Sequence, residues 1–319
     1  MARNLDYRIM KQQAAVAKRE EYGAESVIVC DNLVKIYKIA DLEVVALQGL
    51  DLIVDEAEFI AIVGSSGSGK STLLNILGGL DAPSAGQVNV AGFDLLNMSN
   101  TDRTQYRREM IGFVWQQTAY NLLPYLSAVE NVAMPMSLDG LSGRRRRNRA
   151  MELLDQVGLA DRSTHKPGQL SGGEQQRVAI ATAVANAPTI IFADEPTGEL
   201  DTGTGSEVFE VLKTMNTEHG VTIVVVTHDP LVADHVDRTV AIRDGRTSSE
   251  VLRRTEVNEE GEHRIVAEEF ALLDRVGRLQ LPSEYVDVLE LQRRVRLTLD
   301  PDHINVWPDK PEEESTDES

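Results

Sequence analysis

The residues from Gly64 to Ser71 read GSSGSGKS and have the types and spacing of a loop that holds phosphate groups. Glycine leaves backbone N–H groups unscreened, so such a loop can wrap its donors around phosphate oxygens. Lys70 can reach the β- and γ-phosphates of a nucleotide, and the Ser71 hydroxyl can ligate Mg²⁺. The residues that we expect to bind the nucleotide are Gly64, Ser65, Ser66, Gly67, Ser68, Gly69, Lys70, Ser71 and Thr72.

A second stretch that could meet an anion is LSGGEQQRVAI, from Leu170 to Ile180. Its two adjacent glycines expose backbone donors, and the helix expected to begin there adds N–H groups that have no intrahelical partner. The candidate nucleotide-binding residues of this stretch are Ser171, Gly172, Gly173 and Glu174.

Acidic residues that could support phosphate hydrolysis follow the apolar run from Ile190 to Ala193. Asp194 is placed to orient Mg²⁺, and Glu195 is placed to polarise an attacking water. A further apolar run, VTIVVVTHD, ends in His228, whose imidazole can donate to the γ-phosphate and hold the water and the glutamate in place. Each residue alone could be an ordinary strand end, but together they predict nucleotide hydrolysis.

The flanking sequence supplies elements that would bring these side chains together. The strand-like run FIAIV precedes Gly64 and the helical TLLNILGGL follows Ser71, which is the context that a phosphate loop requires. From Ser26 to about Thr247, short β-branched runs alternate with helical patterns, which predicts an α/β domain. Ligands of such domains bind at the carboxyl ends of the strands. Residues of about 118–165 are expected to form an inserted helical subdomain.

Taken together, these motifs resemble the nucleotide-binding subunits of ATP-binding cassette (ABC) transporters over about residues 26–247. The phosphate loop matches Walker A, Ile190 to Glu195 matches Walker B, and LSGGEQQ matches the family signature. The resemblance implies ATP, Mg²⁺ and a P-loop α/β fold with a RecA-like core, a helical subdomain and an antiparallel β subdomain. It also implies roles for Gln116 as the Q-loop residue and a metal ligand, Asp194 and Ser71 as metal ligands, Asp201 as the D-loop residue, His228 as the switch histidine and Tyr37 as the aromatic that stacks on adenine.

The same resemblance implies partners. Two cassettes would face each other head to tail, so that the signature of one copy binds the γ-phosphate held by the Walker A loop of the other. The stretches VVALQGLDLIV and MIGFVWQQTAYNLLPYLSAVENVAMP most resemble the LolD/MacB/FtsE-like branch, whose partners are FtsX-like membrane permeases. Residues after Gln116 would meet the permease. Thr182 and Glu199 depart from the residues common in the family, and we expect them to alter dimer contacts at most.

The composition changes after Thr247. Residues 248–319 have 19 acidic and 9 basic residues, a net charge of −10. Residues 248–309 are expected to form a separate β-rich module, in which Val295, Leu297 and Leu299 alternate in one strand of a hairpin. The stretch 274–309 resembles the swapped-hairpin module of AbrB-type transcription factors, which implies dimerisation or regulation. DNA binding through its arginines is the alternative, and the surrounding acidity argues against it.

The whole 319-residue chain has a net charge of −19, which argues against a general nucleic-acid binder. No stretch reaches the ~18 consecutive apolar residues of a membrane span, and the first residues lack the apolar segment of a secretory signal. We therefore expect a cytoplasmic protein that reaches the inner face of the membrane through its permease, without direct insertion. The single cysteine, Cys30, is expected to be buried. Residues 1–25 are expected to be a polar extension and 310–319 a disordered acidic tail.

Two alternatives stay open at this point. A soluble ABC ATPase that acts on ribosomes or DNA is the alternative to a transporter subunit, although the chain has one cassette and no long coiled coil or zinc motif. The basic run GRRRR, from Gly143 to Arg147, could contact lipid headgroups or the permease, or it could be the solvated start of a helix.

Overall fold

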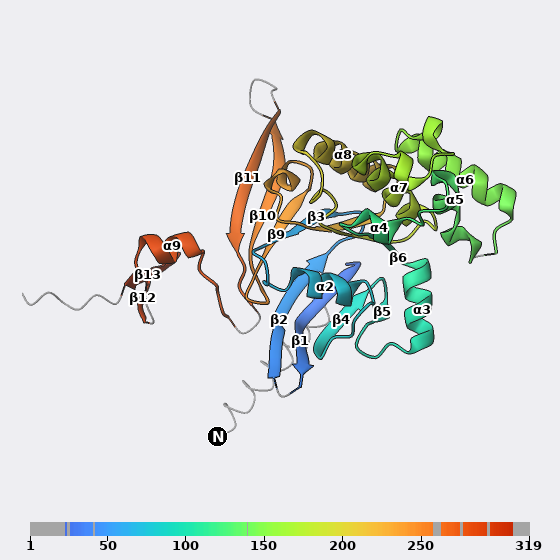
Figure 1. Ribbon diagram of the computed structural model, residues 1–319. Coiled ribbons are helices and arrows are strands. Elements are labelled where there is room, and N and C mark those ends of the chain that lie inside the picture. Colours follow the sequence, from blue (N-terminus) through green and yellow to red (C-terminus); the bar gives the residue numbers. More distant parts are fainter. Residues whose placement is uncertain are drawn as a thin grey trace, which may run out of the picture.

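The computed structural model describes residues 23, 26–40, 42–138, 140–257, 263–274, 277–291 and 294–308. Its strands form a seven-stranded sheet, a four-stranded sheet and a two-stranded hairpin. Figure 1 shows the larger sheet in the middle of the molecule, the four-stranded sheet below it and most of the helices to one side.

The seven-stranded sheet has the order β11-β10-β9-β3-β8-β7-β6, and the five strands from β9 to β6 are parallel. Apolar and β-branched runs form its central strands. The bounds are β3 Phe59–Val63, β6 Ile111–Val114, β7 Ile190–Asp194, β8 Thr222–Val226, β9 Arg238–Arg243, β10 Arg246–Val257 and β11 His263–Ala271. Because parallel strands share one carboxyl edge, the residues that follow β3, β7 and β8 meet there. The predicted α/β fold is confirmed.

Alternate side chains of the central strands belong to two hydrophobic cores. In β7, Ile191 and Ala193 lie in one core and Ile190 and Phe192 lie in the other, so both faces of the sheet are buried. The first core also holds side chains of α7 and α8, and the second holds those of α2. These helices are α2 Lys70–Leu77, α7 Gly172–Val184 and α8 Thr202–His219. Helix α2 therefore covers one face of the sheet, and α7 and α8 cover the opposite face.

The four-stranded antiparallel sheet packs on the α2 side and has the order β2-β1-β4-β5. Its strands are β1 Ile28–Ile39, β2 Leu42–Val54, β4 Ala85–Val90 and β5 Phe93–Asp94. Cys30 is buried between these strands, and burial raises the pKa of its thiol far above the ordinary value. The side chain therefore acts as a small hydrophobe, as expected.

Further α-helices lie between β5 and α7 in the sequence. They are α3 Asn100–Glu109, α4 Thr118–Asn121, α5 Ala128–Ala133 and α6 Gly143–Gln156. Capping boxes start two of them, with Ser99 and Asp102 at α3 and Ser127 and Glu130 at α5. Helices α4 to α6 lie between β6 and β7, within the residues where the sequence predicts an inserted helical subdomain.

Strands β10 and β11 continue the large sheet beyond Thr247, where the sequence led us to expect the end of the cassette. β10 pairs with β9 from Arg246 to Leu252, and β11 pairs with β10 from His263 to Ala271. The expected boundary depended on a change in composition, but these strands form the edge of the sheet, where charged side chains are common. The change in composition therefore marks the sheet edge and not the end of the fold.

The remaining described elements are α9 Ser283–Val288 and a hairpin of β12 Val295–Leu299 and β13 Ile304–Pro308. The hairpin has the expected turn, and Leu299 pairs with Ile304 beside it. The expected acidic tail lies outside the described residues, as does the N-terminal extension except for Gly23.

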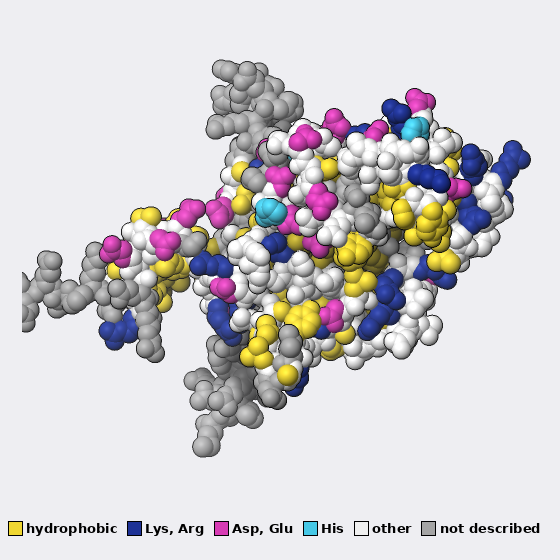
Figure 2. Space-filling view, in the orientation of Figure 1, with side chains coloured by type: hydrophobic (Ala, Val, Ile, Leu, Met, Phe, Trp, Pro, Cys, Tyr) yellow, Lys and Arg dark blue, Asp and Glu magenta, His cyan; other side chains and the backbone are white. Residues whose placement is uncertain are grey.

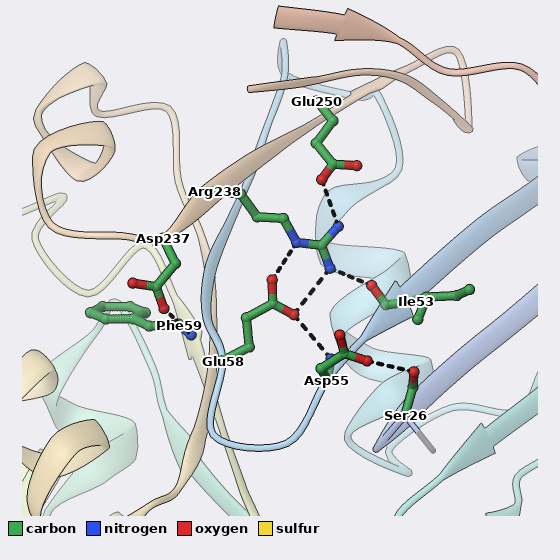
Figure 3. A network of polar contacts seen from close by, with 8 residues as sticks. All are labelled: Ser26, Ile53, Asp55, Glu58, Phe59, Asp237, Arg238 and Glu250. Carbon is green, nitrogen blue, oxygen red and sulfur yellow. Dashed lines mark hydrogen bonds and ion pairs between the residues drawn. The ribbon is translucent and has the colours of Figure 1, made fainter. Parts of the chain in front are cut away.

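Arg238 of β9 connects β10 to the rest of the cassette (Figure 3). Its guanidinium contacts the carboxylates of Glu58, which precedes β3, and of Glu250 in β10, the latter at 3.0 Å, and donates to the backbone oxygen of Ile53 in β2. The Arg238 side chain is 14% exposed and those of Glu58 and Glu250 are 17% and 16% exposed. A paired and mostly buried charge cluster therefore joins four strands or their ends.

Candidate active site

The predicted phosphate loop joins β3 to α2. Gly64, Gly67 and Gly69 have φ angles of 154°, 80° and 107°, which residues with a side chain rarely adopt. A Cβ on Gly64 would lie 2.3 Å from the backbone oxygen of Ile242, and one on Gly69 would lie 2.8 Å from that of Ala46. Nothing lies within 4 Å of a Cβ on Gly67. The loop thus packs closely on one side and leaves space at its tip.

Lys70 lies against this loop, where its Nζ donates to the backbone oxygens of Gly64 at 2.7 Å and Ser65 at 3.0 Å. The Ser68 hydroxyl, in the same described segment, is buried and has no hydrogen-bond partner. A buried lysine, an unsatisfied hydroxyl and a helix start together suit an anionic ligand. The Gly245 N–H, in the β9–β10 turn, supports the loop by donating to the backbone oxygen of Ser68 at 2.9 Å.

Asp194 and Glu195 stand at the carboxyl end of β7, as predicted. Glu195 has a φ of 46°, a left-handed conformation that is unfavourable for residues other than glycine. Its carboxylate accepts hydrogen bonds from the Thr227 hydroxyl at 2.9 Å and the His228 backbone N–H at 3.3 Å, and lies 2.8 Å from His228 Nδ1. The Glu195 side chain is 15% exposed and that of His228 is 72% exposed. The residues after β8 therefore hold an oriented carboxylate.

Electrostatic coupling joins the residues at this edge. Burial raises the pKa of Asp194, the charge of Glu195 raises it further, and the positive charge of Lys70 opposes both. The hydrogen bond to Glu195, together with the charge of that carboxylate, raises the pKa of His228. Lys70, Asp194, Glu195 and His228 thus form one cluster of interacting charges, which is a common property of active sites.

Gln116 follows β6 and is exposed, two residues beyond the end of that strand. The side chain of Asn121 holds the backbone of Trp115, the residue before Gln116. It accepts from the Trp115 N–H at 2.8 Å and donates to the Trp115 backbone oxygen at 2.7 Å. Gln176, in the helix that begins at the signature, donates to the same oxygen at 3.1 Å. The Q-loop is therefore tied to the signature helix, a link that no sequence pattern indicates. Gln176 belongs to the quoted signature, but no pattern identifies its partner.

The signature residues form the first turn of α7. Ser171 caps this helix, because its Oγ accepts from the Glu174 N–H at 3.3 Å and its own N–H donates to Glu174 Oε2 at 2.8 Å. A Cβ on Gly173 would lie 2.2 Å from Thr204 Cγ2, so this glycine allows α7 to pack against α8. The structure thus gives Ser171, Glu174 and Gly173 local structural roles in addition to the predicted phosphate contact.

The signature and the phosphate loop do not meet within one chain. The loop leads into α2 on one face of the large sheet, and the signature opens α7 on the opposite face. The structure brings Lys70, Asp194, Glu195 and His228 together and leaves Ser171, Gly172 and Gly173 apart from them.

Tyr37 and Asp201 have partners in the described chain. The Tyr37 hydroxyl donates to Asp81 at 2.9 Å, and the Lys35 ammonium lies 4.7 Å from the centre of the Tyr37 ring. Burial raises the pKa of Tyr37, and its hydroxyl also interacts with Thr72 at the start of α2. Asp201 caps α8 by accepting from the N–H and the hydroxyl of Thr204 at 3.1 and 2.7 Å.

A groove of about 490 Å³ lies between α3, α7 and the segment after α5. Thr182 lines this groove, although we expected this residue to affect dimer contacts. Its hydroxyl donates to the backbone oxygen of Val178 at 2.8 Å. The other lining residues include Thr104, Arg107, Arg108, Phe113, Asn121, Pro135, Leu138 and Asn186.

Among the described residues, no helix is both long and apolar enough to cross a bilayer.

Comparison with known proteins identifies the family. A family model described as "ABC transporter" matches residues 47–198. An uncharacterised ABC transporter ATP-binding protein of Thermotoga maritima is 51% identical over 212 residues, which cover 66% of this chain and 89% of the relative. The lipoprotein-releasing system ATP-binding protein LolD of Pseudoalteromonas translucida is 44% identical over 220 residues, covering 69% of this chain and 94% of LolD.

Two further similarities extend this result. The macrolide export ATP-binding/permease protein MacB of Syntrophobacter fumaroxidans is 49% identical over 213 residues, and the chain spans only 30% of its length. A dimeric structure of the cassette MJ0796 from Methanocaldococcus jannaschii, bound to ADP and Pi, has a TM-score of 0.64 at 45% identity. The alignment covers 70% of this chain and 97% of that one. With its phosphate loop, acidic strand end and signature, this chain belongs to the ATP-hydrolysing subunits of ABC transporters.

Proposed function

We propose that this chain hydrolyses ATP with Glu195 as the general base and His228 as the residue that holds the base and contacts the γ-phosphate. The observation that carries this proposal is the contact of 2.8 Å between Glu195 and His228 at the strand edge that also holds Lys70. Thr227 fixes the second carboxylate oxygen, so a water beside Glu195 would meet an oriented acceptor. Tyr37, beside α2, would stack on the adenine ring.

The residues at this edge also fit Mg²⁺. Asp194, Ser71 and Gln116 offer the carboxylate, hydroxyl and amide oxygens that this cation prefers. A bound magnesium ion would neutralise phosphate charge. In the chain itself, Lys70 limits the rise in the pKa of Asp194, which favours the ionised carboxylate that a cation requires. Lys70 and the N–H groups of residues 64–72 would hold the phosphates.

The complete site would require two copies of the chain. The signature covers the opposite face of the sheet from the phosphate loop, so Ser171, Gly172 and Gly173 would complete the site of a partner copy. Ser171 caps the first turn of α7. The N–H groups of Gly172 and Gly173 therefore belong to an ordered helix start, which suits an anionic ligand. Asp201, at the start of α8 beside this turn, would lie in the same interface.

Replacing Glu195 by glutamine tests the hydrolytic role, because the amide keeps the shape and cannot accept a proton. We expect the ATPase rate to fall roughly a hundred- to ten-thousand-fold while ATP binding is retained. Glu56→Gln is the matched control, since it makes the same change at an exposed position before β3, at the opposite end of that strand from the site. A wild-type rate in Glu195→Gln would remove Glu195 from the proposed role.

We further propose that the groove lined by Thr182 receives a cytoplasmic segment of an FtsX-like permease at the inner face of the membrane. The similarity to LolD and MacB supports this branch. Arg107 and Arg108 on one wall would suit an acidic segment. Affinity capture of Glu195→Gln with ATP from solubilised membranes, followed by mass spectrometry, would recover such a permease; recovery of ribosomes or DNA without a membrane protein would contradict the proposal.

For the rest of the chain, we propose a cassette from Ser26 to Ala271 and a separate C-terminal module with an AbrB-like, dimerising hairpin. The hairpin exposes Leu297, Leu299 and Ile304, an apolar surface that five-residue strands cannot cover alone. We expect the molar mass from light scattering without ATP to be that of a dimer for the full chain and that of a monomer for a chain ending at Ala271. Equal association of both would contradict the module's role. We expect no DNA binding, given the acidity of the region.

A further inference from the structure

Helix α6 begins with a run of arginines that its own fold does not explain. From Gly143 to Arg149 the sequence has five arginines and no acidic residue. The amino end of a helix has a partial positive charge, so acidic residues are favoured there and basic residues are unfavourable. The first turn of α6 nevertheless has no acidic residue, and the preceding Ser142 makes no side-chain capping bond. Within the chain, Glu152 lies 3.8 Å from Arg149 and the charge of Arg147 lowers the pKa of Glu130, so the basic run is only partly compensated.

The segment leading into α6 adds exposed apolar side chains to these charges. Leu138 is 72% exposed, and Met134 and Leu141 are also exposed. Arg144, Arg145 and Arg147 are exposed directly after them. A combination of basic and apolar side chains on one surface is typical of protein segments that lie in the headgroup region of a bilayer.

The position of this surface also favours a membrane. Leu138 lines the groove that we assign to the permease, and Arg107 and Arg108 line the same groove from α3. Figure 2 shows Lys and Arg side chains gathered at the edge of the molecule over α6 and α3, while acidic side chains dominate elsewhere in the view. Basic groups thus lie in the groove wall on α3 and on α6, which follows the segment that contributes Leu138 to the groove.

We propose that α6 and the segment before it contact a membrane surface rich in anionic lipid. The arginines of residues 144–149 contact headgroup phosphates, and Leu138 and Leu141 lie at the interface. A chain of net charge −19 is repelled by such a surface as a whole, so this local patch orients the approach. The orientation relative to the permease rests on the proposed function, but the binding of lipid does not require it.

Co-sedimentation of the purified full chain with vesicles tests the proposal. We expect binding to vesicles of phosphatidylglycerol and phosphatidylcholine, none to phosphatidylcholine alone, and loss of binding when salt is raised. Replacing Arg144, Arg145 and Arg147 by glutamine should lower the partition coefficient roughly a hundred-fold. The matched control replaces Lys38, Arg278 and Arg296 by glutamine, which removes the same charge from exposed positions elsewhere.

ATPase activity and thermal unfolding of both triple variants separate this proposal from the proposed function. Both variants should hydrolyse ATP as the wild type does and unfold at a similar temperature. Absence of binding to the anionic vesicles, or equal losses in the two variants, would overturn the membrane contact while leaving hydrolysis untouched. Binding that appears only when a permease is reconstituted in neutral vesicles would assign the arginines to an acidic surface of that protein and would also overturn it.

Discussion

At the scale of single residues, the site depends on how Glu195 is held. Three groups of the β8 end, the Thr227 hydroxyl and the backbone and ring nitrogens of His228, contact one carboxylate. A carboxylate with fixed partners loses little orientation freedom when it accepts a proton from water. His228 depends on Glu195 in return, because the carboxylate stabilises the protonated ring.

This dependence predicts a change in histidine titration. In the wild type the pKa of His228 lies above its ordinary value of 6.5, so the ion pair contributes fully below that pH and is lost as the pH rises through the raised pKa. In Glu195→Gln the pKa of His228 should fall toward the ordinary value. Proton NMR titration, with His228→Gln to assign the signal, measures it. An unchanged pKa would mean that the pair does not form in solution.

The positions of the proposed site residues could be predicted from the sequence, but their hydrogen-bond partners could not. Lys70, Asp194, Glu195 and His228 stand at strand ends that are recognisable from apolar runs, so their convergence followed from the topology of a parallel sheet. Thr227 was visible beside His228, yet nothing in the sequence shows that its hydroxyl reaches a carboxylate 32 positions earlier. Asn121 was equally hidden, because a half-buried asparagine has no periodic signal.

At the scale of elements, the packing of α7 on α8 explains one of the signature glycines. Gly173 faces the methyl group of Thr204, and the hydroxyl of Thr204 binds Asp201. The same contact therefore positions the signature turn and the residue that caps α8.

Gly173→Ala should destabilise the fold by about 1–3 kcal/mol, because its Cβ would overlap Thr204 Cγ2. Thr204→Ser removes this methyl group and keeps the hydroxyl, so the same alanine should cost much less in that background. A double-mutant cycle in urea measures the coupling. Additive effects would show that the overlap is relieved elsewhere.

The order of elements was more accessible from sequence than their ends. Alternating runs predicted the α/β core, and the hairpin of Val295 to Pro308 was visible from its alternation and its turn. β10 and β11 were assigned to another module, because the composition becomes acidic after Thr247, although the large sheet continues through both strands. Pairing with β9 and the buried partners of Arg238, not hydrophobic pattern, fix these strands in the sheet.

At the scale of the whole molecule, Arg238 of the seven-stranded sheet contacts strand β10 of the same sheet and strand β2 of the four-stranded sheet (Figure 3). Its removal would leave the carboxylates of Glu58 and Glu250, which are largely shielded from water, without their cation. Removing one partner of a shielded ion pair lowers the stability of a protein more than replacing the whole pair by apolar residues does.

Arg238→Ala should therefore lower the free energy of unfolding by about 3–5 kcal/mol. Arg243→Ala, on the same strand, removes an exposed arginine whose contact with Asp244 is 3.9 Å long, and should cost less than about 1 kcal/mol. Chemical denaturation of both variants gives the comparison. Similar values for the two would show that the cluster contributes no more than a surface pair.

The left-handed backbone of Glu195 has a consequence for the evolution of the chain. Every folded molecule bears the cost of about 1–2 kcal/mol of this conformation, whether or not it meets a nucleotide. Glycine at this position would relieve the strain and remove the carboxylate. Selection for a durable fold alone would thus favour loss of the proposed base, so we expect Glu195 to be retained only where ATP turnover is under selection.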